Sequence, residues 1–180
     1  MSNIFFTADQ HYSHANIIRF CNRPFSSIEE MDEILIQKWN KKIGVNDTTY
    51  CLGDFAMKDA NAYANKLNGK KIFTTGDHDS SLEKIKKSGI ITNYEIHIKQ
   101  VLRINYKNCD ISVLHWLMAI WPKSHYGSWH CFGHSHGRAQ INTGKSWDVG
   151  VDANNYEPVS FDELHEIMKN RPDNPNLIKL

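Results

Sequence analysis

Aspartate, histidine or glycine recurs at five places along the chain, and aspartate and histidine are side chains that bind metal ions. Carboxylate oxygen and imidazole nitrogen suit Mn²⁺, Fe, Zn²⁺, Ni²⁺ and Co²⁺, and no cysteine thiolate belongs to these clusters. A single Asp-x-His or His-x-His triplet occurs by chance in many chains, and a lone Gly-Asp is usually a turn. The joint occurrence of all five clusters indicates a metal site. The clusters are Asp9-Gln10-His11, Gly53-Asp54, Gly76-Asp77-His78-Asp79, His115 and Gly133-His134-Ser135-His136.

Such residues could hold a pair of metal ions, and paired metal ions can catalyse hydrolysis, including that of a phosphate ester. Two cations about 3.5–4 Å apart can clamp a phosphate, lower the pKa of a bridging water and hold the resulting hydroxide in line with phosphorus. An imidazole beside them suits proton transfer, because its unperturbed pKa is close to working pH.

Each cluster follows a stretch that the sequence predicts to be a β-strand. These stretches are short, apolar and rich in β-branched or aromatic residues, and each stops at the Asp, His or Gly of a cluster. In open α/β sheets, ligands bind outside the carboxyl ends of the strands, so the clusters are expected to meet there. The predicted strands that precede the clusters span residues 3–8, 48–52, 70–75, 110–114 and 129–132.

Helices are predicted between several of these strands. Ser26 or Ser27, with Glu29 or Glu30 three residues later, forms a capping-box pattern for a helix that runs to about Lys42. Further helices are expected at 60–67, 82–87 and 161–168, the last with Ser160 as its cap. Two more strands are expected within 90–106, and a last strand at 147–151. Residues 1–180 are expected to form a single domain, with a loose tail at 173–180.

The whole-chain composition excludes several functional classes. The chain has 180 residues, long enough to bury about 70% of its unfolded surface. Its 21 basic and 20 acidic residues give a net charge of +1, which argues against a protein that coats long nucleic acids. No signal peptide and no apolar run of about 20 residues is recognisable, and the four cysteines are scattered. We expect a cytoplasmic protein without a membrane partner.

The order of the clusters resembles the calcineurin-like metallophosphoesterase family, whose motifs run D-x-H, G-D, G-N-H-[DE], H and G-H-x-H. The resemblance covers Asn3 to about Asp152 and is strongest to the small single-domain bacterial and phage members. Those members share a D-x-H-x-x-H-x-N opening, seen here as Asp9, His11, His14 and Asn16. The resemblance implies an α/β fold (α+β in some schemes), a four-layer α/β/β/α sandwich with two mixed β-sheets.

The resemblance also implies a site that holds two divalent transition-metal ions, manganese first, with Fe, Zn, Ni or Co as alternatives. One ion would be held by Asp9, His11, Asp54 and His136, and the other by Asp54, Asp77, His115 and His134. His78 would donate a proton to the leaving oxygen, and Asp79 would orient His78 or raise its pKa. The alternative for His78 is a turn histidine that caps the next helix.

The sequence departs from the family pattern at three points. Asp77 occupies the usual Asn position, so metal binding should survive, but a negative charge is added where the phosphate must lie. Gly53-Asp54 lacks the downstream Asp and Arg of the wider G-D-x-x-D-R form, and Trp116 follows His115 where small members often carry Tyr-Pro.

Other residues could contact the substrate, and for each the alternative is a solvated or purely structural side chain. The candidate substrate-binding residues are His14, Asn16, Arg19, Arg23 and Trp116, with Lys123 and Arg138 as further cations.

The expected function is metal-dependent hydrolysis of a small phosphorylated substrate, a phosphodiester or nucleotide-type compound, including short single-stranded nucleic acid. The alternative is a catalytically weak or silent metal-binding regulatory protein on the same fold. A metallo-β-lactamase would show H-x-H-x-D-H, whereas Gly137 and Arg138 follow His136. The oligomeric state stays open.

Overall fold

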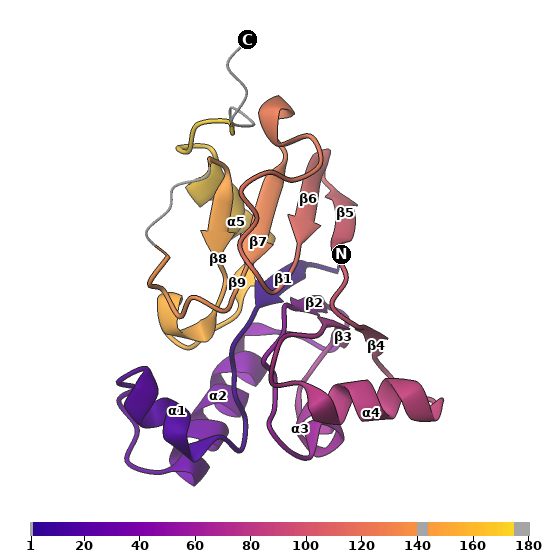
Figure 1. Ribbon diagram of the computed structural model, residues 1–180, viewed down its shortest axis with the longest axis vertical. Helices are drawn as coiled ribbons and strands as arrows, with labels where there is room; N and C mark the ends of the chain where they lie inside the picture. The colour runs from indigo at the N-terminus through magenta and orange to yellow at the C-terminus, as the bar shows by residue number, and fades with distance from the viewer. Residues whose placement is uncertain (1, 140–143, 175–180) are drawn as a thin grey trace.

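Two mixed β-sheets form the centre of the computed structural model, which describes residues 2–139 and 144–174 (Figure 1). The first sheet has the order β4-β3-β2-β1-β9, in which the first four strands are parallel and β9 is antiparallel to β1. Its strands are β1 (Ile4–Thr7), β2 (Thr48–Cys51), β3 (Lys70–Thr74), β4 (Glu95–His97) and β9 (Val159–Ser160). This arrangement confirms the expected α/β fold with mixed sheets.

The second sheet has the order β5-β6-β7-β8. β5 and β6 form an antiparallel pair, whereas β6, β7 and β8 are parallel to one another. The strands are β5 (Leu102–Tyr106), β6 (Cys109–Val113), β7 (Trp129–Phe132) and β8 (Ser146–Asp148). One hydrophobic core joins the two sheets, and it includes Phe6 of β1 and Val113 and Cys131 of the second sheet.

The parallel register places the cluster-bearing loops at one edge. Thr7 of β1 pairs with Cys51 of β2, and Cys51 pairs with Phe73 of β3. Because these residues end or nearly end their strands, the loops that follow leave the first sheet side by side. Val113 and Cys131 pair in the same way in the second sheet, so His115 and the loop after β7 also emerge together.

Helices α2, α3 and α4 cover the outer face of the first sheet, α1 joins the same core through Ile17, and α5 packs against β1, β8 and β9 (Figure 1). Met31, Leu35 and Trp39 of α2 are buried at helical spacing in the core under that first sheet. Fully burying an apolar side chain contributes about 1.5–3 kcal/mol, so this stripe fixes α2 on the sheet. The helices are α1 (Ala15–Phe20), α2 (Ile28–Lys42), α3 (Ala60–Lys66), α4 (Ser80–Ser88) and α5 (Phe161–Met168).

Two helices begin at the expected serine caps. The Ser27 hydroxyl accepts a hydrogen bond from the backbone N–H of Glu30 at 3.1 Å, and the Glu30 carboxylate accepts one from Ser26. Ser160 and Glu163 form a reciprocal capping box at the start of α5. Local sequence therefore determined where both helices start.

A loop covers part of the outer face of the second sheet. The segment from 114 to 128, which contains the 3₁₀ helix η1 (Ser124–Tyr126), lies over His130 of β7. His130 is fully buried, and its ring lies 5.4 Å from the ring of Trp121.

The predicted strands and helices are confirmed, with small shifts at their ends, but the sequence did not predict α1, β9 or the 3₁₀ helices η1 and η2 (Val151–Ala153). Most of the expected loose tail, residues 175–180, lies outside the described residues. Asn174 belongs to the expected tail but is not loose, because it is buried and its side chain donates a hydrogen bond to the carbonyl of Ala119 at 2.7 Å.

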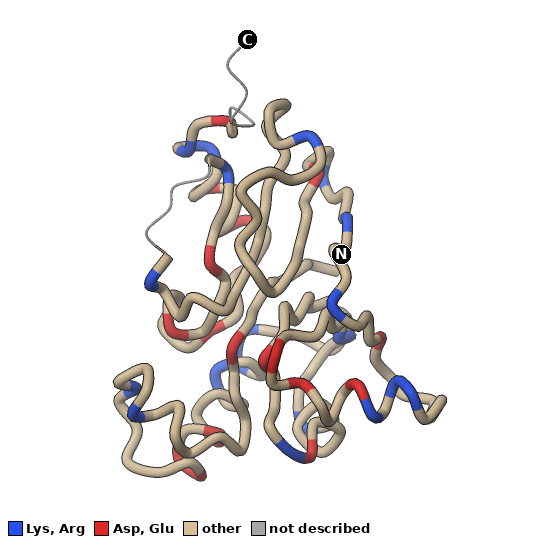
Figure 2. Tube along the Cα trace, viewed as in Figure 1, with Lys and Arg blue, Asp and Glu red and all other residues tan. Residues whose placement is uncertain are grey.

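Charge is distributed over the molecule, as the balanced composition predicts. Lys and Arg positions lie on both sheets and on most helices and do not gather along one side of the trace (Figure 2). In the described part of the chain, every helix is too short or too polar to cross a bilayer.

Candidate metal centre

The predicted ligands lie on loops that hold unusual backbone conformations. Five of the seven adopt a positive φ between 49° and 67°, a region that residues other than glycine rarely enter. Such strain costs about 1–3 kcal/mol per residue and is found mainly at functional sites, where the surrounding structure maintains it. The five residues are Asp9, His11, Asp54, His134 and His136.

Six predicted ligands come together in two groups of three. The ligand atoms of Asp9, His11 and His136 all lie within 4.8 Å of one another, and those of Asp54, His115 and His134 do the same. Asp54 also lies between the groups. Its Oδ2 atom is 3.5 Å from His11 Nε2 and 3.5 Å from His115 Nε2. This is the position required of a carboxylate shared by two cations.

Several of the atoms that face this centre have no hydrogen-bond partner among the residues that the structure describes. They are Asp9 Oδ1, His11 Nε2 and His115 Nε2, all buried. Leaving a buried polar atom unpaired costs about 1–3 kcal/mol, so three such atoms in one place need an explanation. Oxygen and imidazole donors without thiolate fit divalent transition metals, and cations at this centre would satisfy all three atoms.

Two of the histidines have outer partners that fix their ring orientation. His115 Nδ1 lies 2.7 Å from the carbonyl of Leu52, which can only accept, so Nδ1 carries the proton and Nε2 keeps its lone pair. His136 Nδ1 lies 2.7 Å from Asp152 Oδ2. Partners of this kind orient metal-binding histidines and raise their basicity.

Burial and neighbouring charges shift the pKa values in the centre. Burial raises the pKa of Asp9 well above its ordinary value, and the carboxylates of Asp148 and Asp54 raise it further. Burial also lowers the pKa of His11 to about 2, with additional contributions from His136 and Arg23. His11 is therefore neutral with an available lone pair, whereas Asp9 needs a nearby positive charge to ionise readily.

Arg23 does not contact substrate as the sequence suggested, because it is buried and its donors are occupied. Its Nε and Nη2 atoms each donate to an oxygen of Asp152 at 2.8 Å. Its Nη1 atom donates to the carbonyl of Gln10 at 2.9 Å, and Nη2 also donates to that of Asp9 at 2.7 Å. Arg23 thus supports the loop that carries Asp9 and His11.

Asp152 is a functional candidate that the sequence reasoning missed. It joins Arg23 to His136, and it lies in an Asp-x-Gly-x-Asp run that begins at Asp148, the last residue of β8. Burial alone would raise the pKa of Asp152, but the hydrogen bonds from His136 and Arg23 lower it below its usual value. Asp148 of the same run accepts from Ser135 Oγ and from the backbone N–H of Gly137, which holds the loop of His134 and His136.

Asp79 does not orient His78, contrary to the expectation. Its carboxylate accepts hydrogen bonds from the backbone N–H groups of Asp54 (2.7 Å), Phe55 (2.8 Å) and Gly76 (2.8 Å). Burial raises the pKa of Asp79 to about 6 despite these bonds. Its role in the fold is to tie the loop after β3 to the loop after β2.

A cavity of about 360 Å³ opens over the centre. His78 is exposed at this cavity, with its ring 5.4 Å from that of His11 and 5.9 Å from that of His14. Its backbone N–H donates to Asp54 Oδ1 at 2.9 Å, which fixes its position relative to the centre. The other lining residues are His14, Asp54, His134 and His136, the less polar Ile17, Phe20, Cys21 and Met57, and Arg138.

Asp77 lies next to His134 but outside both groups of three. Its Oδ2 atom accepts from Trp116 Nε1 at 3.2 Å and lies 3.8 Å from His134 Nδ1. Its Oδ1 atom lies 3.7 Å from Lys99 Nζ, a neighbour that the sequence did not indicate. Trp116 was predicted to contact substrate, and its hydrogen bond to Asp77 places it next to the centre.

His14 also lies at the centre, with its Nδ1 atom 3.3 Å from His11 Nδ1. Asn16 and Arg19 are exposed on α1 and do not line the cavity, so the structure does not bring these two to the site.

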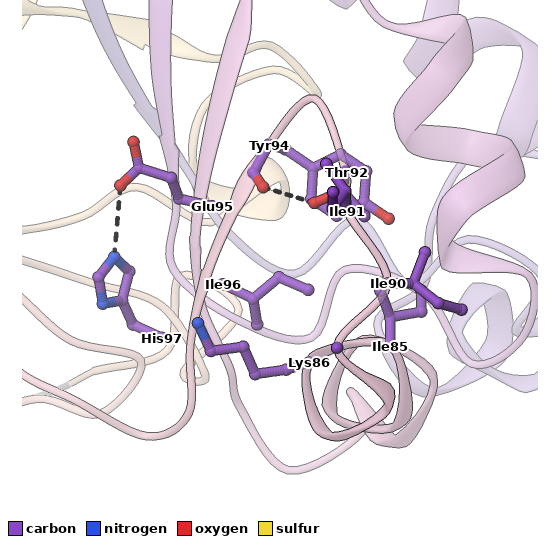
Figure 3. A pocket seen from close by; sticks show the side chains of 10 residues that line it. Ile85, Lys86, Ile90, Ile91, Thr92, Tyr94, Glu95, Ile96 and His97 are labelled. Atoms are coloured by element: carbon purple, nitrogen blue, oxygen red, sulfur yellow. Dashed lines mark hydrogen bonds and ion pairs between the residues drawn. The ribbon is translucent and has the colours of Figure 1, made fainter.

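A cavity of similar volume, about 380 Å³, lies beside β4 and α4 (Figure 3). Ile90 and Ile91 are exposed there, and Glu95 and His97 face each other at 3.7 Å. None of the predicted ligands lines it. The two cavities therefore cannot be told apart by volume. The cavity over the centre is the candidate site because metal-binding side chains converge on it.

Comparison with known proteins identifies relatives without an assigned activity, and no family model matches the chain. The chain is 31% identical over 85 residues to the Gene 66 protein of Mycobacterium phage L5, which covers 44% of this chain and 41% of that protein. The crystal structure of AQ665, a protein of unknown function from Aquifex aeolicus, has a TM-score of 0.71 and covers 93% of this chain and 100% of that chain. At 22% identity this is a likeness of fold.

The similarity to an archaeal protein extends over almost the whole chain. The uncharacterized protein MJ1445 of Methanocaldococcus jannaschii is 33% identical over 184 residues, which cover 94% of this chain and 93% of that protein. The chain described here belongs to the family of MJ1445.

Proposed function

We propose that the protein is a dinuclear-metal phosphoric ester hydrolase that acts on a small phosphodiester or nucleotide-type substrate. The observation that carries this proposal is the position of Asp54 Oδ2, 3.5 Å from an imidazole nitrogen of each group. The two groups resemble the ligand sets of calcineurin-like metallophosphoesterases. The buried atoms of Asp9, His11 and His115 that have no hydrogen-bond partner in the described part of the chain support the presence of cations.

The roles of the residues follow from their positions. Asp9, His11 and His136 would hold one ion, His115 and His134 the other, and Asp54 both. Bound metal ions of this kind, Mn²⁺ first, supply a hydroxide nucleophile near neutral pH and neutralise phosphate charge. His78, exposed at the cavity, can protonate the leaving oxygen.

Asp77 supports a second candidate function. Its carboxylate, beside His134, adds negative charge where an anionic substrate must approach, which favours a metal-binding regulatory protein with little or no turnover. The exposed Lys99 beside Asp77 offsets part of this charge.

The deciding experiment measures hydrolysis of bis(p-nitrophenyl) phosphate and p-nitrophenyl phosphate with Mn²⁺ and with chelator. We expect Mn²⁺-dependent hydrolysis that falls by at least about 100-fold in Asp54→Ala, since losing an outer partner of a metal site alone costs about 10–100-fold. Asp162→Asn is the matched control, because Asp162 is an exposed aspartate on α5 whose neighbour is Lys107.

Two results would count against the proposal. Hydrolysis that survives both chelator and Asp54→Ala would remove the mechanism. Stoichiometric Mn²⁺ binding without hydrolysis of either ester would favour the regulatory alternative.

A further inference from the structure

The cavity over the metal centre is lined by two kinds of side chain. The imidazoles, the carboxylate of Asp54 and the guanidinium of Arg138 are the polar kind. Ile17 and Phe20 of α1, Cys21, and Met57 of the loop after β2 are apolar, and we call them the apolar wall. Metal ions and a phosphate group require only the polar lining, so the apolar wall needs a separate explanation.

Phe20 is the most prominent part of this wall. The side chain is 54% exposed although it lies at the cavity, and large aromatic side chains are usually well buried. Neighbours hold its position. The ring meets that of His14 edge to face at 6.4 Å, and the Arg19 guanidinium lies over it at 5.3 Å. Arg138 Nη2 donates to the Phe20 carbonyl at 3.0 Å, which joins the end of α1 to the loop after β7.

The cavity is large enough for a small molecule that contacts both the polar lining and the apolar wall. A volume of about 360 Å³ lies within the range of about 300–1,000 Å³ typical of small-molecule sites. A phosphate at the metal ions would leave the apolar wall available to a group attached to it. A planar ring can stack on an exposed aromatic side chain, whereas an alkyl group gains only burial.

We propose that Phe20, with Ile17 and Met57, forms a subsite for a planar aromatic group, such as a nucleobase, carried by the same molecule as the phosphate at the metal centre. This subsite rests on the proposed function, because the metal ions hold the phosphate. It specifies a nucleotide-type ligand over a sugar or alkyl phosphate.

The test compares two ligands that differ only in the base. Isothermal titration calorimetry of the Mn²⁺-loaded protein gives the dissociation constants of adenosine 5′-monophosphate and ribose 5-phosphate, with inorganic phosphate as a third probe. We expect the nucleotide to bind about 5- to 150-fold more tightly than the sugar phosphate, equal to about 1–3 kcal/mol at about 1.4 kcal/mol per factor of ten.

Substitutions at Phe20 separate stacking from simple burial. Phe20→Leu keeps an apolar side chain of similar size and should reduce the affinity ratio to near one, whereas Phe20→Trp should retain it. Tyr126→Leu is the matched control, since Tyr126 is a 79% exposed aromatic residue of η1 that does not line the cavity. Thermal unfolding of each variant checks that the fold is intact.

The outcomes distinguish this subsite from the proposed function. Equal affinities for the two ligands, with inorganic phosphate bound, would overturn the subsite alone. A ratio that Phe20→Leu leaves unchanged would do the same. If the Mn²⁺-loaded protein bound none of the three phosphate compounds, the proposal of a phosphate site at the metal centre would be wrong, and the proposed subsite would be wrong too.

Discussion

At the scale of single residues, the charge at position 77 is the feature with the clearest consequence. The Asp77 side chain is 42% exposed, contacts Trp116 Nε1 and lies near Lys99. Its distance of 3.8 Å from His134 Nδ1 places a negative charge next to the second group of predicted ligands. A phosphate bound there would be repelled by this charge.

We expect Asp77→Asn to raise kcat/KM about fivefold. Two like charges about 4 Å apart repel by about 1 kcal/mol in water and about 4 kcal/mol at an effective dielectric of 20, and exposure favours the lower value. At about 1.4 kcal/mol per factor of ten, the lower value corresponds to about fivefold. The measurement is kcat/KM for an aryl phosphodiester at saturating Mn²⁺, with Asp162→Asn as control. An unchanged or lower kcat/KM would contradict this account.

At the scale of structural elements, one buried ion pair joins three loops around the centre. Arg23 follows α1, Asp152 lies in η2, and the carbonyls of Asp9 and Gln10 belong to the loop after β1. The pair is almost completely buried, and Asp152 also binds the ring of His136. A change at this pair should therefore affect both stability and metal affinity.

Replacing Asp152 with Asn should destabilise the metal-free protein by about 3–5 kcal/mol, because the buried Arg23 charge would lose its partner. Mn²⁺ affinity should fall about 10–100-fold as His136 loses its oriented acceptor. Urea unfolding and Mn²⁺ titration measure the two effects. The double variant Arg23→Met with Asp152→Asn should unfold less easily than Asp152→Asn alone. A loss below about 1 kcal/mol in the single variant would show that the pair does not stabilise the fold.

At the scale of the whole molecule, the loop over the second sheet makes stability depend on pH through His130. The ring is buried, its Nδ1 atom lies 3.1 Å from the Ser112 carbonyl, and its Nε2 atom accepts from the Met118 N–H at 3.1 Å. A neutral imidazole satisfies both contacts, with one donor and one acceptor. Protonation would place an N–H against the N–H of Met118.

Burial lowers the pKa of His130 to about 4 in the folded protein. As pH falls below about 6.5, the unfolded chain binds this proton while the folded chain does not, so the free energy of unfolding should decrease between about pH 6.5 and pH 4. The total loss from this group is about 3 kcal/mol. In metal-free protein, His130→Gln should flatten the pH dependence of urea unfolding over that window. His165→Gln, at an exposed histidine of α5, should not; equal slopes in wild type and His130→Gln would refute the assignment.

The sequence by itself determined the features that depend on neighbours along the chain. Apolar runs ending at Asp9, Asp54 and His115 marked strands and their cluster-bearing ends, and the Ser27 and Ser160 caps marked the start of two helices. These signals are local, because strand alternation and capping involve residues only a few positions apart. The choice of most predicted ligands followed from the same strand ends, and their metal binding stays a prediction.

Only the tertiary structure decided features that depend on neighbours in space. Asp152 and Arg23 are 129 positions apart, so no local pattern could assign Arg23 to the fold instead of the substrate. The three backbone N–H groups that occupy Asp79 arise from the packing of two loops, and β9 is a strand only because β1 pairs with its two residues. Burial and hydrogen-bond geometry are properties of the folded arrangement, and they decide whether a charged side chain is free to bind a ligand.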